Sequence, residues 1–149
     1  MSKMSRDKGK AGEREAANEI SRVTGMRVIR RVRNRAGESD LIGVPGWDIE
    51  VKRYARISQA DADRFWGQAT DQAEIAGKRP LLVYRQNAAK WMARWPLNTV
   101  PGMESAGPEH WVEGSIETWF RAVLASMEPW KAVQSTDTQL GGGAAGEQS

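Results

Sequence analysis

The 149-residue chain contains no cysteine and only one histidine, His110. Without cysteine the chain can form no disulfide, no thiol nucleophile and no zinc site of the cysteine type. A single imidazole also excludes sites that need two or three histidines. Any bound metal ion must therefore be held by oxygen atoms, which favours Mg²⁺, Mn²⁺ or Ca²⁺ over softer ions.

Long hydrophobic runs are absent as well. Apolar residues make up 40% of the chain and charged residues 28%, with a mean hydropathy of −0.62. No apolar run approaches the roughly 18 residues that a membrane-spanning helix needs. The first twenty residues are polar and charged, without the apolar stretch of a secretory signal. The composition predicts a single cytoplasmic domain with no membrane partner.

Basic residues are concentrated in the first part of the chain. Residues 1–56 contain 14 Lys or Arg against 8 Asp or Glu, whereas residues 57–149 contain 8 against 11. A basic surface of this kind attracts phosphates, so a polyanion is the expected partner. The alternative is a solvated basic face with no ligand. The cations that we expect to contact such a polyanion, DNA above all, are Lys8, Lys10, Arg30, Arg31, Arg33, Arg35 and Arg53.

Hydrophobic periodicity predicts an α/β fold, with a mixed central sheet flanked by helices. A core over residues 10–97 is expected to follow a flexible basic arm (1–9) and to precede an extension with one helix (98–133) and a disordered tail (134–149). We expect Trp111 on or beside a helix. The predicted helices cover 10–24, 58–76 and 115–127, and the predicted strands cover 26–33, 39–44, 47–54, 80–85 and 90–95, the first three as a meander.

Two carboxylates on neighbouring predicted strands can converge. Asp40 begins one strand, and Glu50 and Lys52 lie on the next, after a Pro-Gly turn. Strand alternation places Asp48, Glu50 and Lys52 on the face opposite the apolar residues. Two close carboxylates repel each other unless a divalent cation lies between them, and a nearby ammonium can orient the attacking water or balance developing charge. The arrangement predicts hydrolysis of phosphodiester bonds.

The same residues also have a simpler structural interpretation. Asp40 could cap a turn, and Glu50 and Lys52 could form an ordinary exposed pair. The agreement between strand alternation, the turn and the basic flank favours a site instead.

Two further positions could contribute to this site. Glu13 lies on the first predicted helix, one turn before the inward-facing Ala16 and Ala17, although a carboxylate near a helix N-terminus can also be there for the helix dipole alone. Gln68 and Gln72, one turn apart on the second helix, could reach the site or could be exposed amides.

Three motifs occur in a familiar order. The stretch KGKAGERE starts at Lys8, SDLIG contains Asp40, and IEVK contains Glu50 and Lys52. In order and spacing they resemble the motifs of the PD-(D/E)XK nuclease superfamily, and within it the archaeal-type Holliday junction resolvases and their phage-borne relatives. The resemblance extends to about Trp95.

This resemblance implies a restriction-endonuclease-like fold and a Mg²⁺-dependent endonuclease, in which Mn²⁺ can substitute, acting on branched DNA. It assigns Glu13, Asp40, Glu50 and the Val51 carbonyl to the metal ion, and Lys52 to the attacking water. Cutting a junction symmetrically implies a homodimer. It also implies a bacterial or phage-infected cell as the setting.

Two other functions remain open at this point. One is a nuclease of the same fold that acts on linear duplex or single-stranded DNA. The other is a non-enzymatic DNA-binding module in which the carboxylates are structural. Cleavage that depends on a divalent ion separates this module from both enzymes.

Overall fold

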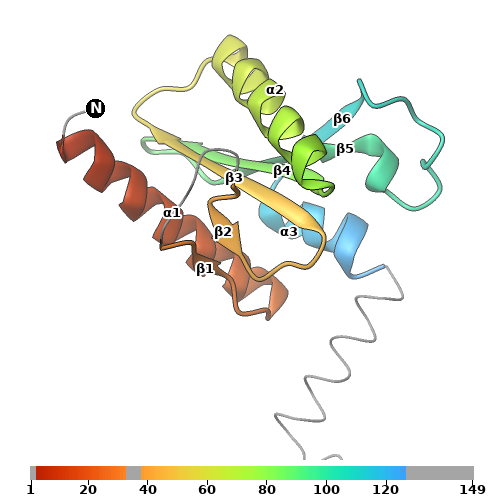
Figure 1. The fold of residues 1–149 in the computed structure, drawn as a ribbon, viewed down its shortest axis with the longest axis horizontal. Coiled ribbons are helices and arrows are strands. Elements are labelled where there is room, and N and C mark those ends of the chain that lie inside the picture. Colours follow the sequence, from red (N-terminus) through yellow and green to blue (C-terminus); the bar gives the residue numbers. More distant parts are fainter. Residues whose placement is uncertain (1–2, 33–37, 127–149) are drawn as a thin grey trace, which may run out of the picture.

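The computed structural model describes residues 3–32 and 38–126, with side chains from residue 9 onward. The strands of these residues form one sheet in chain order (Figure 1). β3 and β4 are parallel, and every other neighbouring pair is antiparallel, so the predicted mixed sheet is confirmed. The strands are β1 (Ile29–Arg30), β2 (Leu41–Ile42), β3 (Trp47–Tyr54), β4 (Arg79–Gln86), β5 (Met92–Pro96) and β6 (Trp111–Gly114).

The helices lie on both faces of the sheet, α1 and α3 on one face and α2 on the other (Figure 1). In the described residues no helix is both long enough and apolar enough to cross a membrane. The helices are α1 (Lys3–Thr24), α2 (Gln59–Ala76) and α3 (Ile116–Trp119), which continues as a π-helical turn over Phe120–Leu124; a short 3-10 turn covers Leu97–Thr99.

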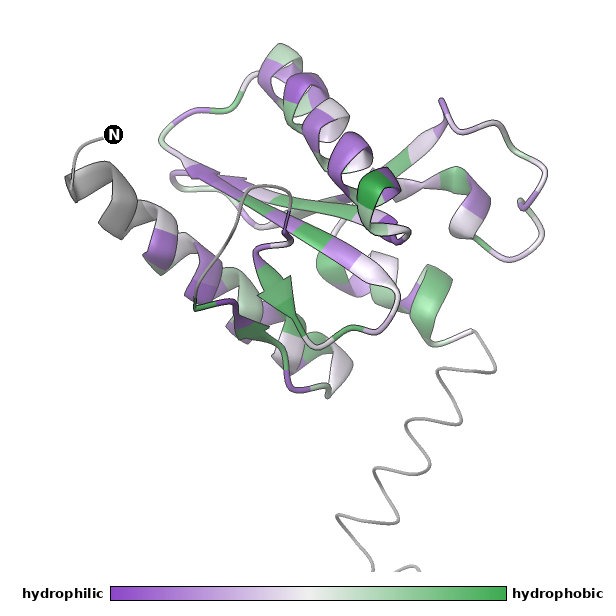
Figure 2. Cartoon of the chain, in the orientation of Figure 1, coloured by the Kyte–Doolittle hydropathy of each residue, from purple (hydrophilic) through white to green (hydrophobic). Residues whose placement is uncertain are grey.

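The larger core lies between the sheet and α1 and α3. Ala16 and Ile20, four residues apart on α1, are fully buried against Ile49 of β3. Trp47 of β3 meets Trp119 of α3 edge to face, with ring centroids 5.4 Å apart. The four-residue spacing of Ala16 and Ile20 places them on one apolar stripe of α1, and this stripe packs on one face of the sheet. Hydrophobic and hydrophilic segments accordingly alternate along the helices in Figure 2.

A smaller core lies between α2 and the opposite face of the sheet. Phe65, Trp66 and Ala69 of α2 pack against Leu82 of β4. Because both faces of β3 are covered, even the polar Asp48 is buried on the α2 side. The side chains of β3 that point toward α2 are therefore held in a partly enclosed space rather than in open solvent.

The start of α2 is fixed by a capping box. The Ser58 hydroxyl accepts a hydrogen bond from the Asp61 N–H at 3.0 Å, and the Asp61 carboxylate accepts one from the Ser58 N–H at 3.0 Å. At the other end, Gly77 adopts a positive φ of 68° that glycine tolerates at a helix C-terminus. The predicted boundaries of this helix are confirmed.

We expect Ser58→Ala to lower the free energy of unfolding by about 1 kcal/mol, because the first turn of α2 loses one of its two reciprocal bonds. For a domain of this size that loss corresponds to a decrease in melting temperature of about 2–4 °C. Ser58→Thr, which keeps the hydroxyl, is the matched control and should melt close to the parent. Equal melting of Ser58→Ala and the parent would show that the box contributes nothing.

Several elements differ from the predicted ones. α1 begins at Lys3, so residues 3–9, expected as a flexible arm, extend the helix. This segment lacks an apolar stripe but is rich in residues that favour helices, such as Lys, Arg and Met. β1 and β2 are only two residues long each. The strand β6 was not predicted, and Trp111 lies on it rather than on a helix. It is an edge strand whose pairing with β5, not its own pattern, defines it.

The rest of the sequence predictions divide in two. The strands expected at 80–85 and 90–95 appear as β4 and β5. The third helix, expected over 115–127, starts after Ser115, whose hydroxyl accepts a hydrogen bond from the Thr118 N–H, but its α-helical part covers only Ile116–Trp119 before the π-helical turn. The proposed tail (134–149) and residues 33–37 lie outside the described residues. The domain boundaries stay predictions.

Candidate active site

The antiparallel pairing of β2 with β3 brings Asp40 next to Glu50. Leu41 lies opposite Ile49, and the Asp40 N–H donates to the Ile49 carbonyl at 2.9 Å. In this register Asp40 lies opposite Glu50, and the Asp40 carboxylate accepts a hydrogen bond from the N–H of the next residue, Val51, at 2.8 Å. Asp40 and Glu50 therefore lie side by side on the face of the sheet that α2 covers, as the strand alternation predicted.

These two carboxylates are costly to ionise together. Burial raises the pKa of Asp40 to about 7, and the neighbouring charge of Glu50 adds to the effect, while the Val51 hydrogen bond opposes it. Burial likewise raises the pKa of Glu50 above its ordinary value, and Lys52 opposes that increase. A divalent cation between the two groups would remove this repulsion.

Lys52 approaches Glu50 from the same strand face. Its Nζ lies 3.6 Å from Glu50 Oε2, and the two side chains are only 19% and 15% exposed. The ammonium also lies 5.1 Å from the centre of the Phe65 ring on α2. Phe65 thereby limits the conformations of the lysine, so that its charge stays at the edge of the carboxylate pair.

Gln72 of α2 bridges two carboxylates of β3. Its amide nitrogen donates to Asp48 Oδ1 at 2.8 Å and to Glu50 Oε1 at 3.3 Å. Asp48 is only 2% exposed, so it anchors the amide inside the protein. Gln68 is exposed and makes no hydrogen bond to these carboxylates within the described residues. Of the two glutamines named from the sequence, the structure brings Gln72 to the site.

Glu13 reaches the site from α1. Gly12 lets the helix approach β3 closely, since a Cβ at that position would lie 2.6 Å from the Arg53 Cβ. The Glu13 carboxylate accepts a 2.9 Å bond from Arg30, and its charge contributes to the raised pKa of Asp40. Glu13 thus lies near the carboxylate pair, and in this structure it is paired with a cation.

The predicted DNA-binding cations differ in whether their charge is already paired within the protein. Arg31 donates to the Ser39 carbonyl at 2.9 Å, and Arg53 donates to Asn87 Oδ1 at 2.8 Å. Lys10 is exposed. The Lys8 side chain, Arg33 and Arg35 lie outside what the structure describes. Arg30, as noted, is paired with Glu13.

A network that the sequence did not reveal holds α2 over the sheet. Arg94 of β5, fully buried, donates to Asp63 of α2 and to Glu113 of β6, both at 2.9 Å, and Tyr84 donates to Glu113 at 2.7 Å. The guanidinium also stacks on Trp111, 3.8 Å from its ring centre. A lone arginine in a strand gives no signal of such partners. The network supports the helix that carries Phe65 and Gln72.

The donor atoms at this site fit a hard divalent cation. No group of three Asp, Glu, His or Cys side chains in the described residues is arranged to enclose a metal ion. Mg²⁺, however, commonly uses one or two carboxylates and completes its coordination with waters and substrate phosphates. Asp40 and Glu50 offer such a pair, since burial raises the pKa of both, with a further increase for Asp40 from the charge of Glu50 and for Glu50 from the charge of Asp48. A bound divalent ion would activate water and stabilise the charge that develops on phosphate.

The comparison with known families decides the relationship. The profile of a family described as "Phage putative PDDEXK endonuclease" matches residues 4–137. The chain belongs to this family. The PD-(D/E)XK resemblance of the three motifs is thereby confirmed, and so is the predicted α/β, restriction-endonuclease-like fold class. The match continues past Trp95, where the motif resemblance ends, through β6 and α3. PD-(D/E)XK nucleases generally use divalent metal ions.

No curated protein matches the chain. Among solved structures the chain is similar to Hjc, a Holliday junction resolvase from the archaeal hyperthermophile Archaeoglobus fulgidus. The sequence identity is 18% and the TM-score 0.42, over 75% of this chain and 88% of that chain.

Proposed function

We propose that this member of the PD-(D/E)XK family is a Mg²⁺-dependent DNA endonuclease, in which Mn²⁺ can replace Mg²⁺. The observation that carries the proposal is the group formed by Asp40, Glu50 and Lys52, in which two partly buried carboxylates lie beside an ammonium 3.6 Å from one of them. Phosphodiester hydrolysis needs charge stabilisation at the phosphate and an activated water, and these residue types supply both.

Each residue has a separate role in this proposal. Asp40 and Glu50 bind the metal ion, together with the Val51 carbonyl oxygen, and Glu13 supports it from α1. Lys52 holds the attacking water and balances negative charge on the transition state. Gln72, bonded to both Asp48 and Glu50, fixes the orientation of the Glu50 carboxylate and so acts as a positioning residue.

The proposed substrate is branched DNA, and the proposed active form is a homodimer. Symmetric cutting of a four-way junction requires two nicks, and the part of the chain that the structure describes holds one such group of residues, so two copies are needed. A basic surface binds the phosphates of the DNA backbone, so the affinity for DNA falls steeply as the salt concentration rises. The residues that contribute to this surface are Lys8, Lys10, Arg30, Arg31, Arg33, Arg35 and Arg53.

The test is a cleavage assay on a four-way junction and on a linear duplex of equal length. We expect cleavage in Mg²⁺ and Mn²⁺, binding without cleavage in Ca²⁺, no requirement for zinc and complete loss of cleavage in EDTA. Sedimentation of the protein at the assay concentration reports the oligomeric state.

The outcomes separate the alternatives. Full cleavage in chelator contradicts the metal roles of Asp40 and Glu50. Equal affinity for junction and duplex, or a strictly monomeric active protein, excludes the junction proposal and leaves a nuclease for linear DNA. Metal-independent binding with no cleavage in any ion leaves the non-enzymatic DNA-binding module.

A further inference from the structure

An exposed aromatic residue lies directly beside the proposed catalytic lysine. Tyr54 ends β3, two residues after Lys52, so both side chains point toward α2. Phe65 of α2 contacts both of them. Its ring lies 5.1 Å from the Lys52 ammonium and stacks on the Tyr54 ring at 5.5 Å between centroids, with an angle of 14° between the planes.

This stacking leaves part of the Tyr54 ring open. Phe65 covers one face of the ring, yet the residue is still 47% exposed. The Tyr54 hydroxyl makes no hydrogen bond to any described residue. The Phe65 ring holds the Tyr54 ring in place, and the Tyr54 hydroxyl has no partner among the described residues. Tyr54 is therefore a flat, preorganised surface rather than a core residue.

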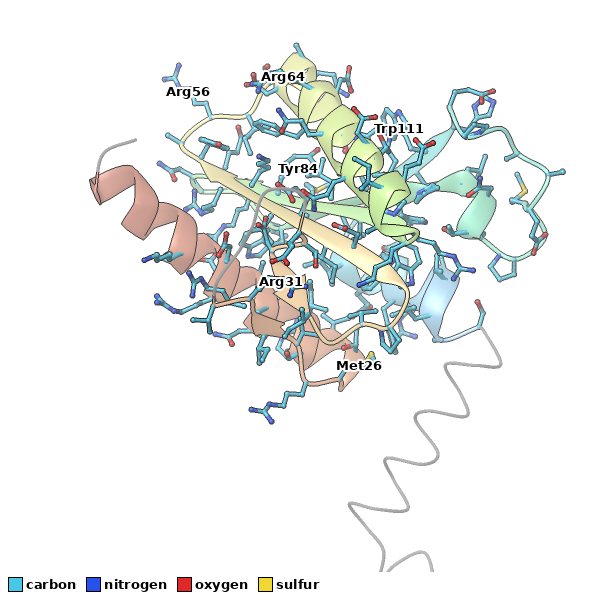
Figure 3. All side chains as sticks on the ribbon, in the orientation of Figure 1. Met26, Arg31, Arg56, Arg64, Tyr84 and Trp111 are labelled. Carbon is cyan, nitrogen blue, oxygen red and sulfur yellow. The ribbon has the colours of Figure 1, made fainter. Side chains whose placement is uncertain are left out.

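Cations flank this surface. Arg64 of α2 lies over the Phe65 ring, 4.8 Å from its centre, and Arg56 is exposed on the connection between β3 and α2. Both residues lie at the same end of the molecule, beside the start of α2 (Figure 3). Aromatic rings interleaved with cations are the combination that binds single-stranded nucleic acid, since bases stack on the rings and phosphates approach the cations.

We propose that Tyr54 is a stacking platform for one nucleobase next to the phosphate that is cut. Bases inside a continuous duplex have both faces covered by their neighbours, so the platform accepts only a base with one free face. Such bases occur at branch points, at helix ends and in single strands. The inference rests on the proposed nuclease function and deepens it, because it gives a structural reason for choosing branched over continuous DNA.

The variant test compares Tyr54→Ala with Tyr54→Phe, which keeps the ring. On a forked DNA bound in Ca²⁺, we expect Tyr54→Ala to weaken affinity about 5- to 150-fold, the range for loss of one base–aromatic stack, and Tyr54→Phe to stay within about twofold. Ile75→Ala is the control, because Ile75 is an 84% exposed apolar residue at the other end of α2. Its affinity should equal that of the parent.

A second measurement changes the DNA and leaves the protein intact. Forked substrates that carry a single abasic site are scanned across the positions around the cut, or around the branch point where no cut occurs. We expect one position at which removal of the base weakens binding by the parent as much as the Tyr54→Ala substitution does. At that position, removal of the base should not weaken binding by Tyr54→Ala any further. Where the alanine variant does not fold, the scan of the parent alone still tests the platform, because a parent that no abasic position weakens overturns it.

Each result bears on the platform. The proposal is overturned where Tyr54→Ala binds forked DNA as the parent does, where it is equally impaired on every abasic substrate, or where no abasic position weakens the parent. Absence of cleavage by the folded parent in Mg²⁺ and Mn²⁺ contradicts the nuclease function instead. The binding comparison in Ca²⁺ still decides the role of Tyr54 in that case.

Discussion

Lys52→Ala is expected to lower the rate of DNA cleavage by about 100-fold or more, the usual loss for a residue that assists proton transfer. The Lys52 ammonium is held 3.6 Å from Glu50 and beside Phe65, so no other described lysine can take its place on this strand face. DNA affinity should change by less than about threefold, because backbone contacts are distributed over many cations. Glu50→Gln should give the same combination of lost cleavage and retained binding.

Single-turnover cleavage and binding in Ca²⁺ measure these two quantities separately. Lys78→Ala is the matched control, since Lys78 is an exposed lysine after α2 and should cleave at the parent's rate. A purified, folded Lys52→Ala protein that cuts within about threefold of the parent contradicts the proposed role, because that loss is far below the one expected for an acid–base group.

Asp40→Asn is expected to stabilise the metal-free protein at pH 8. The pKa of Asp40 is raised from its ordinary value of 3.8 to about 7 by burial and by the Glu50 charge, so the folded state favours the protonated form. This increase in pKa means that ionised Asp40 lowers the free energy of unfolding by about 4 kcal/mol at most. Asparagine keeps an oxygen that can accept the Val51 hydrogen bond but carries no charge.

The sign of the pH dependence follows from the same pKa. Between about pH 4 and pH 7 the folded protein holds a proton on Asp40 that the unfolded chain has released, so this group's contribution to stability falls as the pH rises. Above pH 7 the penalty is complete. The stability difference between Asp40→Asn and the parent should therefore be largest at pH 8 and small near pH 4.

Denaturant unfolding in EDTA at pH 5 and pH 8 measures this difference. Added Mg²⁺ should stabilise the parent by binding the folded state, and should stabilise Asp40→Asn much less, because the variant lacks one of the proposed carboxylate ligands. An Asp40→Asn protein less stable than the parent at pH 8 would show that the carboxylate is not repelled at this position.

The strand β3 illustrates what local patterns can predict. Alternation of Trp47, Ile49 and Val51 with polar residues fixed both its bounds and the face on which Glu50 and Lys52 lie, because the side-chain period of a strand is two. The bounds of α2 could also be predicted from the sequence, since Ser58 and Gly77 mark its ends. Local patterns could not predict the bounds of the short strands β1 and β2 or of the edge strand β6, because pairing with neighbouring strands defines them.

The amino-acid sequence by itself determined the family, because the order and spacing of three motifs indicated a PD-(D/E)XK nuclease and the family profile matches residues 4–137. It also predicted a group of oxygen ligands with an adjacent ammonium. Only the tertiary structure decided which residues surround that group. Gln72 rather than Gln68 reaches Glu50, Arg30 pairs with Glu13, and Phe65 holds Tyr54 beside Lys52. These contacts join residues from different elements. They depend on how helices pack on a sheet, and side-chain periodicity within one element carries no information about its neighbour.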